Sequence, residues 1–326
     1  MKTIELIVPC YNEEKCVELF YNRVKEVFTN MQGYDFIITY VDDGSKDRTR
    51  EQIKEVAASV DSGKVQYMFL SRNFGKEAAI YAGLSQCTGD YVAVLDADLQ
   101  HPPELLKQMI AAIEEEGYDC ASARRVSRKG EPLIRSIFSR AFYHVINRIT
   151  VIDLVPGSTD YRLMKRRVVK AIVSMTERER FTKGIYAWVG FKNKWIEYEN
   201  VERAAGSTSW SFWGLARYAY SGFIAFATAP LRGVVYFGML IVLIAIIGAV
   251  YVFIGALNTP DASRTGFSTL LIVMLFLGGV IITILGMIGE YMARIYMEVK
   301  QRPIYFTKET NMEWATEAET TKGDNT

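Results

Sequence analysis

Two long stretches without a charged residue constrain the fold of this chain more than any other feature. Residues 233–257 and 267–289 contain no Asp, Glu, Lys or Arg, and each is long enough to cross a bilayer as a helix. Basic residues precede the first stretch and follow the second, so the positive-inside rule predicts a transmembrane hairpin at about 230–293 with both ends cytoplasmic. A helical pair buried in the core of a water-soluble protein is the alternative.

The preceding part of the chain has the pattern of an α/β domain. Apolar runs of strand length, at residues 4–8, 36–41, 65–70 and 91–95, alternate with stretches of helical periodicity. This order predicts a Rossmann-like, mostly parallel sheet with helices on both faces. We therefore expect a cytoplasmic domain over residues 1–229, then the hairpin, then a cytoplasmic segment over residues 294–326 that is disordered after about residue 310.

Two further segments have the composition of helices at a membrane surface. Residues 134–150 have an apolar stripe at helical spacing with basic residues on the other side, and residues 210–229 are aromatic and poor in charge. Both segments are expected to be interfacial amphipathic helices, although the first could equally pack on the sheet with its charges in water.

Charge and cysteine content exclude several classes of protein. The net charge of +1 gives no electrostatic footprint for nucleic acid, and the four cysteines are scattered without metal-binding or disulfide spacing. No Gly-x-Gly-x-x-Gly motif follows a strand, which argues against a dinucleotide-binding dehydrogenase. The apolar run at residues 4–8 is too short for a signal peptide, so the amino-terminal domain is expected to stay in the cytoplasm of the cell.

A pair of carboxylates follows the most apolar of the predicted strands. Asp96 and Asp98 come directly after residues 91–95, at the edge where open α/β sheets bind their ligands. In an extended segment both side chains would point to the same side, and two such anions repel each other unless a cation lies between them. The pair therefore predicts a Mg²⁺ or Mn²⁺ site beside a bound diphosphate. The alternative is that Asp-x-Asp only caps the following helix.

Four motifs occur together in a recognisable order. Pro9-Cys10-Tyr11-Asn12-Glu13, Asp42-Asp43-Gly44-Ser45, Arg72-Asn73-Phe74-Gly75 and Asp96-Ala97-Asp98-Leu99-Gln100 resemble those of family 2 glycosyltransferases with the GT-A fold. The segments 157–163, 180–184, 188–191 and 289–303 are similar to those of membrane-anchored polyisoprenyl-phosphate glycosyltransferases, the group of the bactoprenol glucosyltransferases and dolichyl-phosphate mannose synthase. The resemblance extends from Pro9 to about Tyr305.

The resemblance implies an inverting glycosyltransferase at the cytoplasmic face of the cell membrane. Such an enzyme would move glucose or N-acetylglucosamine from a UDP-sugar to polyprenyl (undecaprenyl) phosphate for cell-envelope glycan modification, and relatives suggest a homo-oligomer. Other donors, such as GDP-mannose or a UDP-4-amino-arabinose, remain open, and so does a catalytically inactive membrane scaffold. A processive polysaccharide synthase would carry Gln-x-x-Arg-Trp, which this sequence does not contain.

The resemblance also assigns roles to residues. Asp160 is the expected base or acceptor-orienting residue, with a plain salt bridge to Arg162 as the alternative. Asp96 and Asp98 would hold the metal, and Gln100 would contact the sugar or the metal. The residues expected at the nucleotide are Pro9, Tyr11, Asn12, Glu13, Asp42, Asp43, Asn73, Lys76, Asp96 and Ala97. Those expected at the acceptor phosphate or the diphosphate are Arg124, Arg180, Lys183 and Arg203, each of which could instead be an ordinary surface charge. Ser209 stands where the family pattern has a lysine.

Overall fold

The computed structural model describes residues 1–126, 147–148, 154–199, 229–258 and 267–312. Apart from residues 147–148 and 229, the two predicted interfacial helices lie outside these ranges, as do Arg203 and the tail from residue 313. The chain divides into two units, one formed by residues 1–225 with the segment from Pro303 onward, and the other by residues 226–302.

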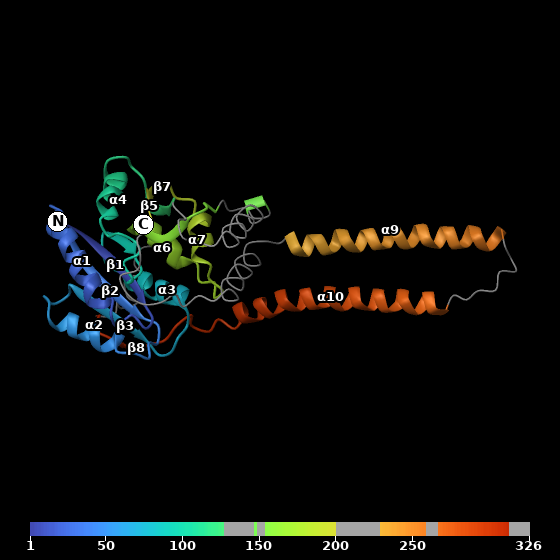
Figure 1. The fold of residues 1–326 in the computed structure, drawn as a ribbon, viewed down its shortest axis with the longest axis horizontal. Helices are drawn as coiled ribbons and strands as arrows, with labels where there is room; N and C mark the ends of the chain where they lie inside the picture. The colour runs from blue at the N-terminus through green and yellow to red at the C-terminus, as the bar shows by residue number, and fades with distance from the viewer. Residues whose placement is uncertain (127–146, 149–153, 200–228, 259–266, 313–326) are drawn as a thin grey trace, which may run out of the picture. The chain divides into compact units, whose positions relative to one another are not determined.

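The first unit is built on one sheet of eight strands in the order β7-β5-β6-β4-β1-β2-β3-β8 (Figure 1). Strands β1 to β4 are parallel, as the sequence pattern predicts, while β6 runs antiparallel to β4 and β5, β7 is parallel to β5, and β8 is antiparallel to β3. The strands are β1 (Lys2–Cys10), β2 (Tyr34–Asp42), β3 (Val65–Leu70), β4 (Tyr91–Val94), β5 (Cys120–Arg125), β6 (Ser158–Lys165), β7 (Asn193–Tyr198) and β8 (Thr307–Thr310).

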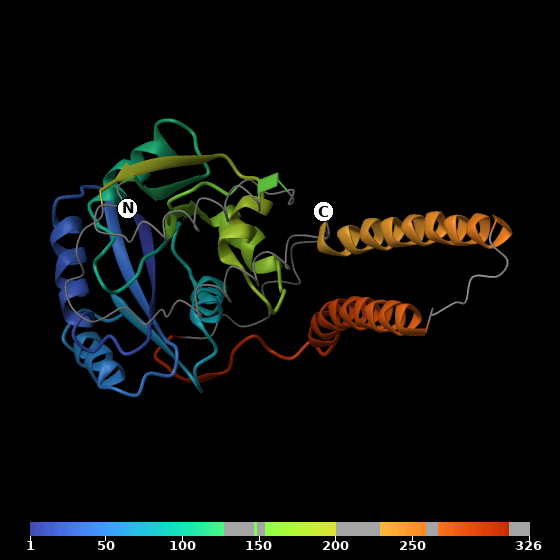
Figure 2. The same cartoon turned by 45° about the vertical axis from the view of Figure 1, so that its right-hand side comes forward.

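Helices cover both faces of this sheet, which is why its central strands are apolar along their whole length. Figure 2 shows the blue helices α1 and α2 on one side, and α3 with α6 and α7 in teal and yellow-green on the other. Leu6 pairs with Ile38 on β2 and Ala93 on β4, and all three side chains are buried. The helices of this unit are α1 (Val17–Thr29), α2 (Thr49–Ala58), α3 (Lys76–Gln86), α4 (Leu105–Glu114), α6 (Arg166–Ser174) and α7 (Thr182–Trp188).

The carboxyl-terminal segment returns to the sheet as the edge strand β8. Thr310 pairs with Met68, and the Asn311 side chain accepts a hydrogen bond from the Tyr67 amide at 2.7 Å and donates one to the Val65 carbonyl at 3.1 Å. Sequence patterning did not predict this strand, because Thr307–Thr310 is polar and too short to show periodicity. The segment therefore contacts β3 up to Asn311, and the remainder of the tail predicted to be disordered lies outside the described residues.

The second unit contains the two apolar stretches as helices, α9 (Ala229–Asn258) and α10 (Phe267–Val299). Within the described residues, one helical segment is long and apolar enough to cross a membrane, Val273–Val299, with a mean hydropathy of 2.1. Gly233–Gly248 forms a shorter apolar helix. The helical nature of both stretches agrees with the sequence analysis, and the two-span hairpin remains a prediction.

Gly44 marks the point where the loops after β2 and β3 approach each other most closely. Its φ angle is +76°, a conformation that favours glycine. A Cβ atom at this position would lie 2.5 Å from the backbone nitrogen of Asn73 and 2.6 Å from the carbonyl carbon of Arg72. Only glycine allows this approach of two backbones, so the loop after β3 depends on Gly44 for its position.

We predict that Gly44→Ala lowers the free energy of unfolding by about 3 kcal/mol, because a positive φ and a clash with backbone atoms add together. Gly63→Ala is the matched control: Gly63 has a φ of +87° but open space around it, so it should lose only about 1 kcal/mol. Denaturant titration of the detergent-solubilised chain compares the two, and equal losses would show that the close approach is not needed.

Candidate active site

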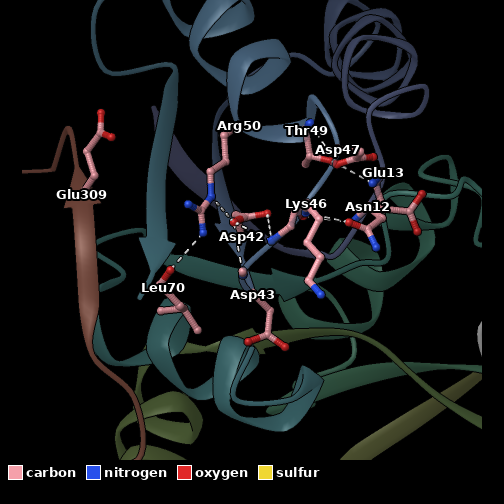
Figure 3. Close-up of polar contacts among 12 residues, drawn as sticks. Asn12, Glu13, Asp42, Asp43, Lys46, Asp47, Thr49, Arg50, Leu70 and Glu309 are labelled. Atoms are coloured by element: carbon pink, nitrogen blue, oxygen red, sulfur yellow. Dashed lines mark hydrogen bonds and ion pairs between the residues drawn. The ribbon is translucent and has the colours of Figure 1, made fainter. Parts of the chain in front are cut away.

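Hydrogen bonds from backbone amides to side-chain oxygens connect the loops that follow β1 and β2 (Figure 3). The Asn12 amide donates to Ser45 Oγ at 2.9 Å, and Asn12 Oδ1 accepts from the Lys46 amide at 2.9 Å. The Glu13 amide donates to Thr49 Oγ1 at 2.8 Å. These bonds fix Asn12 at a φ of +57° and leave the Tyr11 ring 40% exposed. The sequence-predicted residues Pro9, Tyr11, Asn12 and Glu13 therefore lie together at the carboxyl end of β1.

Asp42 lies inside the protein, and its predicted contact with the nucleotide stays a prediction. Its side chain is 0% exposed and pairs with Arg50 Nε at 2.6 Å (Figure 3). Its two oxygens also accept hydrogen bonds from the Gly44 and Ser45 amides at 3.2–3.3 Å. Both oxygens of Asp42 are therefore engaged within the chain, where they stabilise the turn after β2.

Asp43 binds the loop after β3 and is also buried. Its carboxylate accepts from the Phe74 amide at 2.6 Å and from the Gly75 amide at 2.9 Å. Burial raises the pKa of Asp43 above its ordinary value, although the two amide hydrogen bonds oppose this shift. Asp43 thus holds the segment that leads into α3, where the sequence analysis expected a nucleotide contact.

The Lys76 side chain joins two carboxylates that come from different strands. Lys76 is the first residue of α3, and its Nζ lies 2.7 Å from Asp96 Oδ1 and 2.9 Å from Asp160 Oδ2. Asp96 follows β4, and Asp160 lies on β6. The other oxygen of Asp160, Oδ1, is buried without a hydrogen-bond partner among the described residues. The structure therefore brings together the predicted metal ligand, the predicted base and a lysine that the sequence analysis had assigned to the nucleotide.

The opposite charges in this cluster stabilise the ionised form of each group, although burial opposes ionisation. Burial alone would raise the pKa of Asp160, but the Lys76 and Lys183 ammonium groups lower it below its ordinary value. Burial likewise opposes the charge of Asp96, whose pKa is lowered by Lys76 and His101. Burial would lower the pKa of Lys76, and the two carboxylates raise it instead. At neutral pH the cluster therefore holds two carboxylates and one ammonium group.

His101 is a member of the site that the sequence analysis missed. Its Nε2 lies 3.7 Å from Asp96 Oδ2, and its Nδ1 shares a 2.6 Å hydrogen bond with the hydroxyl of Tyr198 on β7. The ring also contacts Tyr161. The one feature of the sequence that could have identified His101 is its position directly after Gln100. Its contact with β7 could not be seen in the sequence.

Asp98 does not lie in an extended segment, so the geometric premise for the acid pair was wrong. Strand β4 ends at Val94, and the turn that follows has a positive φ of 57° at Leu99. The Asp98 side chain is buried, and its Oδ1 accepts a hydrogen bond from the Gln100 amide at 3.1 Å. Ala97 is buried in the hydrophobic core, which leaves only its backbone for a nucleotide.

The donors present suit a hard divalent cation. Within the described residues there is no group of three or more His, Cys, Asp or Glu side chains placed to hold a metal. A Mg²⁺-type ion does not require one, because it is usually bound by one or two carboxylates with water and substrate phosphates as the other ligands. Asp96 and Asp98, with the Gln100 amide oxygen nearby in sequence, meet that requirement.

The predicted phosphate-binding cations occupy different environments. Arg180 is 8% exposed and donates to the carbonyls of Met175 and Ile172 at the end of α6, while its Nε has no hydrogen-bond partner among the described residues. Arg124 donates to the Pro156 carbonyl at 3.2 Å. Lys183 Nζ donates to the Ser158 carbonyl at 3.0 Å and is close enough to Asp160 to lower its pKa. Of these cations, Lys183 on α7 is the one the structure places near Asp160.

The alternative of a plain salt bridge between Asp160 and Arg162 is not what the structure shows. The Arg162 guanidinium lies 3.3 Å from the centre of the Tyr186 ring, and among the described residues no ion pair joins it to Asp160. Asp160 pairs with Lys76 instead. The second oxygen of Asp160 is buried and has no hydrogen-bond partner among the described residues.

Proteins of similar sequence match almost the whole length of this chain. The relative CsbB of Bacillus subtilis (strain 168), named as a glycosyltransferase, is 45% identical over 309 residues, which cover 95% of this chain and 92% of the relative. The prophage bactoprenol glucosyl transferase homolog of Escherichia coli (strain K12) and the bactoprenol glucosyl transferase of Shigella phage SfII are each 38% identical, over 94% of this chain and 98% of the relative. Among solved structures, the mannosyltransferase PcManGT from Pyrobaculum calidifontis aligns at 17% identity with a TM-score of 0.47, over 84% of this chain and 79% of that chain.

A domain match agrees with these relatives. The Glycosyl transferase family 2 domain matches residues 5–173, a range that begins in β1, includes the Asp96–Lys76–Asp160 cluster and ends in α6. The chain therefore belongs to glycosyltransferase family 2 and is a glycosyltransferase.

Proposed function

We propose that this glycosyltransferase moves a hexose from a UDP-sugar to the phosphate of a membrane polyprenol. The observation that carries the proposal is the cluster in which Lys76 joins Asp96 and Asp160 at the carboxyl end of the parallel strands. The second oxygen of Asp160 is buried there without a hydrogen-bond partner among the described residues. Two relatives of nearly the same length are named bactoprenol glucosyl transferases or their homologues, which supports a polyprenyl phosphate acceptor and glucose as the sugar.

The proposed reaction is a single displacement at the anomeric carbon. An oxygen of the acceptor phosphate forms the new bond to that carbon, the bond to the β-phosphate oxygen of the donor breaks, and UDP leaves with the electron pair, so the configuration is inverted. A phosphate monoester has its second pKa near ~6, so little proton transfer is needed at neutral pH. Asp160 Oδ1 would accept the proton of a monoanionic acceptor, or orient the acceptor otherwise.

A divalent cation would be held by Asp96 and Asp98, with the Gln100 side chain as a further oxygen donor. Bound there, Mg²⁺ or Mn²⁺ would neutralise charge on the departing diphosphate. The residues of the chain must in addition bring two anions, the donor diphosphate and the acceptor phosphate, within reaction distance. Lys183, which lies close enough to Asp160 to lower its pKa, is a cation placed to contribute to this.

A lipid acceptor fits the apolar second unit. The Val273–Val299 segment of α10 has the length and hydropathy of a membrane span, and α9 contains a second apolar stretch. A transferase that acts on soluble acceptors has no need of these segments. We infer a two-span hairpin with the catalytic unit and both termini on the cytoplasmic side, because basic residues flank the outer ends of the two apolar stretches.

The direct test is incubation of the purified full chain with undecaprenyl phosphate, Mn²⁺ and a panel of nucleotide sugars, with the glycolipid detected by mass spectrometry. UDP-glucose is expected to give polyprenyl-phosphate-glucose, and UDP-N-acetylglucosamine is the second candidate. GDP-mannose or a UDP-4-amino-arabinose as the preferred donor would correct the sugar. No transfer from any donor would favour the catalytically inactive scaffold.

We predict that Asp96→Asn and Asp98→Asn each lower kcat by at least about 100-fold, since each removes charge from the ion that stabilises the departing diphosphate. Asp90→Asn is the matched control: Asp90 precedes β4 and accepts a hydrogen bond from the Thr3 amide, away from the carboxyl end of the sheet. It should retain nearly full activity. Undiminished turnover of the unmodified chain in excess EDTA would contradict the metal role.

We predict that Asp160→Asn lowers kcat by about 100-fold or more while the Kd for UDP changes less than about threefold, because Asp160 acts on the acceptor and not on the nucleotide. Single-turnover transfer assays and calorimetric UDP titration separate the two effects. A parallel loss of UDP binding and turnover would instead assign Asp160 a role in shaping the nucleotide site.

A further inference from the structure

Lys76 occupies a position that is locally unfavourable for a lysine. It is the first residue of α3, where the positive end of the helix dipole repels a cation, and the preceding Gly75 has a φ of +99°. A cation at the positive end of a helix dipole is expected only where an interaction with another part of the structure compensates for the repulsion. The requirement here is the pair of carboxylates at 2.7 and 2.9 Å from its ammonium group.

Those two carboxylates would repel each other without Lys76. In the antiparallel pairing of β4 with β6, Val94 lies opposite Arg162, so Asp96 and Asp160 are each two residues further toward the same edge. The side chains are only 26% and 18% exposed, so water screens their repulsion weakly. Lys76 supplies the positive charge that allows both to stay ionised.

The backbone that carries Lys76 is fixed from two sides. Asp43 accepts hydrogen bonds from the Phe74 and Gly75 amides, and the Ser71 amide donates to the Phe306 carbonyl at 2.9 Å. The Lys76 side chain as a whole is 37% exposed. A long side chain on a fixed backbone allows the ammonium group to change partners while it stays beside Asp160.

We propose that Lys76 is a positioning residue that holds Asp160 through Oδ2 and competes with the divalent cation for Asp96. In the empty site the ammonium group pairs with both carboxylates. When a divalent cation binds Asp96, that contact is replaced and Lys76 remains on Asp160, so that Oδ1 stays directed at the acceptor. The competition rests on the proposed metal role of Asp96, whereas the hold on Asp160 does not.

The test is a titration of the full chain in detergent with Mn²⁺ alone, in which the free ion is followed by electron paramagnetic resonance. Lys76→Met removes the competing ammonium group from Asp96, which keeps its contact with His101, so Mn²⁺ should bind about tenfold more tightly than in the unmodified chain. A residue that only supports the fold, or that only binds nucleotide, would leave the affinity unchanged or weaken it. Unchanged or weaker Mn²⁺ binding would therefore overturn the proposal.

Lys64→Met is the matched control. Lys64 also pairs with an aspartate, Asp35, but this pair is not at the carboxyl end of the sheet, so its loss should not alter Mn²⁺ affinity. Asp96→Asn separates this inference from the proposed function. If Asp96→Asn leaves Mn²⁺ binding intact, the metal assignment itself is wrong. If it abolishes binding while Lys76→Met does not tighten it, only the role given to Lys76 fails.

If Lys76→Met folds poorly without metal, two further measurements test the same role. Mn²⁺ should raise the thermal midpoint of the variant by more than it raises the midpoint of the unmodified chain, because the ion replaces the missing positive charge. Failure of Mn²⁺ to stabilise the variant would count against the proposal. In transfer assays at saturating Mn²⁺, Lys76→Met should lower kcat with little change in donor KM, and Lys76→Arg should recover part of kcat. An effect on donor KM alone would show that Lys76 binds the nucleotide sugar and would contradict its role as a positioning residue.

Discussion

The antiparallel pairing of β6 with β4 is the constraint on which the candidate site depends. Parallel strands bring only their carboxyl ends to the ligand edge, and β1, β2 and β4 do so here. Because β6 runs the other way, the first half of this strand reaches the same edge, and Asp160 arrives beside Asp96. Two carboxylates then lie on one face of adjacent strands, which requires a cation. Lys76 provides it from α3, the helix that covers this face.

The acidic motifs of the chain therefore divide into two kinds by environment. Asp42 and Asp43 are buried, and their oxygens are used by backbone amides and by Arg50, so they hold the loops after β2 and β3 in place. Asp96 and Asp160 keep partial exposure, and their partners are side chains that can move. Carboxylates of the first kind build the edge of the sheet, and those of the second kind can exchange partners with a ligand.

The sequence predicted the strands that are apolar on both faces and did not identify those that carry polar residues on one face. Strands β1 to β4 are buried on both sides, so their apolar runs predicted them to within a few residues. Strand β6 carries Asp160 and Arg162 on the face toward α3 and α7, which breaks the apolar run that would have identified it. The acid motif located Asp96, but the turn at Leu99 and the link from His101 to Tyr198 depend on contacts between distant segments. The position of Lys76 between Asp96 and Asp160 could not be predicted either, because it depends on strands β4 and β6 meeting at one edge.

The carboxyl-terminal segment makes the catalytic unit depend on residues beyond the apolar helices. Strand β8 covers the otherwise free edge of β3, and Asn311 caps it with two hydrogen bonds. The Phe306 carbonyl accepts the Ser71 amide, the Phe306 ring contacts Phe74, and Tyr305 shares a 3.0 Å hydrogen bond with Ser85 on α3. These contacts flank the loop that positions Lys76. The residues before the apolar helices therefore do not complete the site by themselves. A catalytic fragment without these helices must retain residues 303–312, joined to the preceding part of the chain by a linker that replaces the helices.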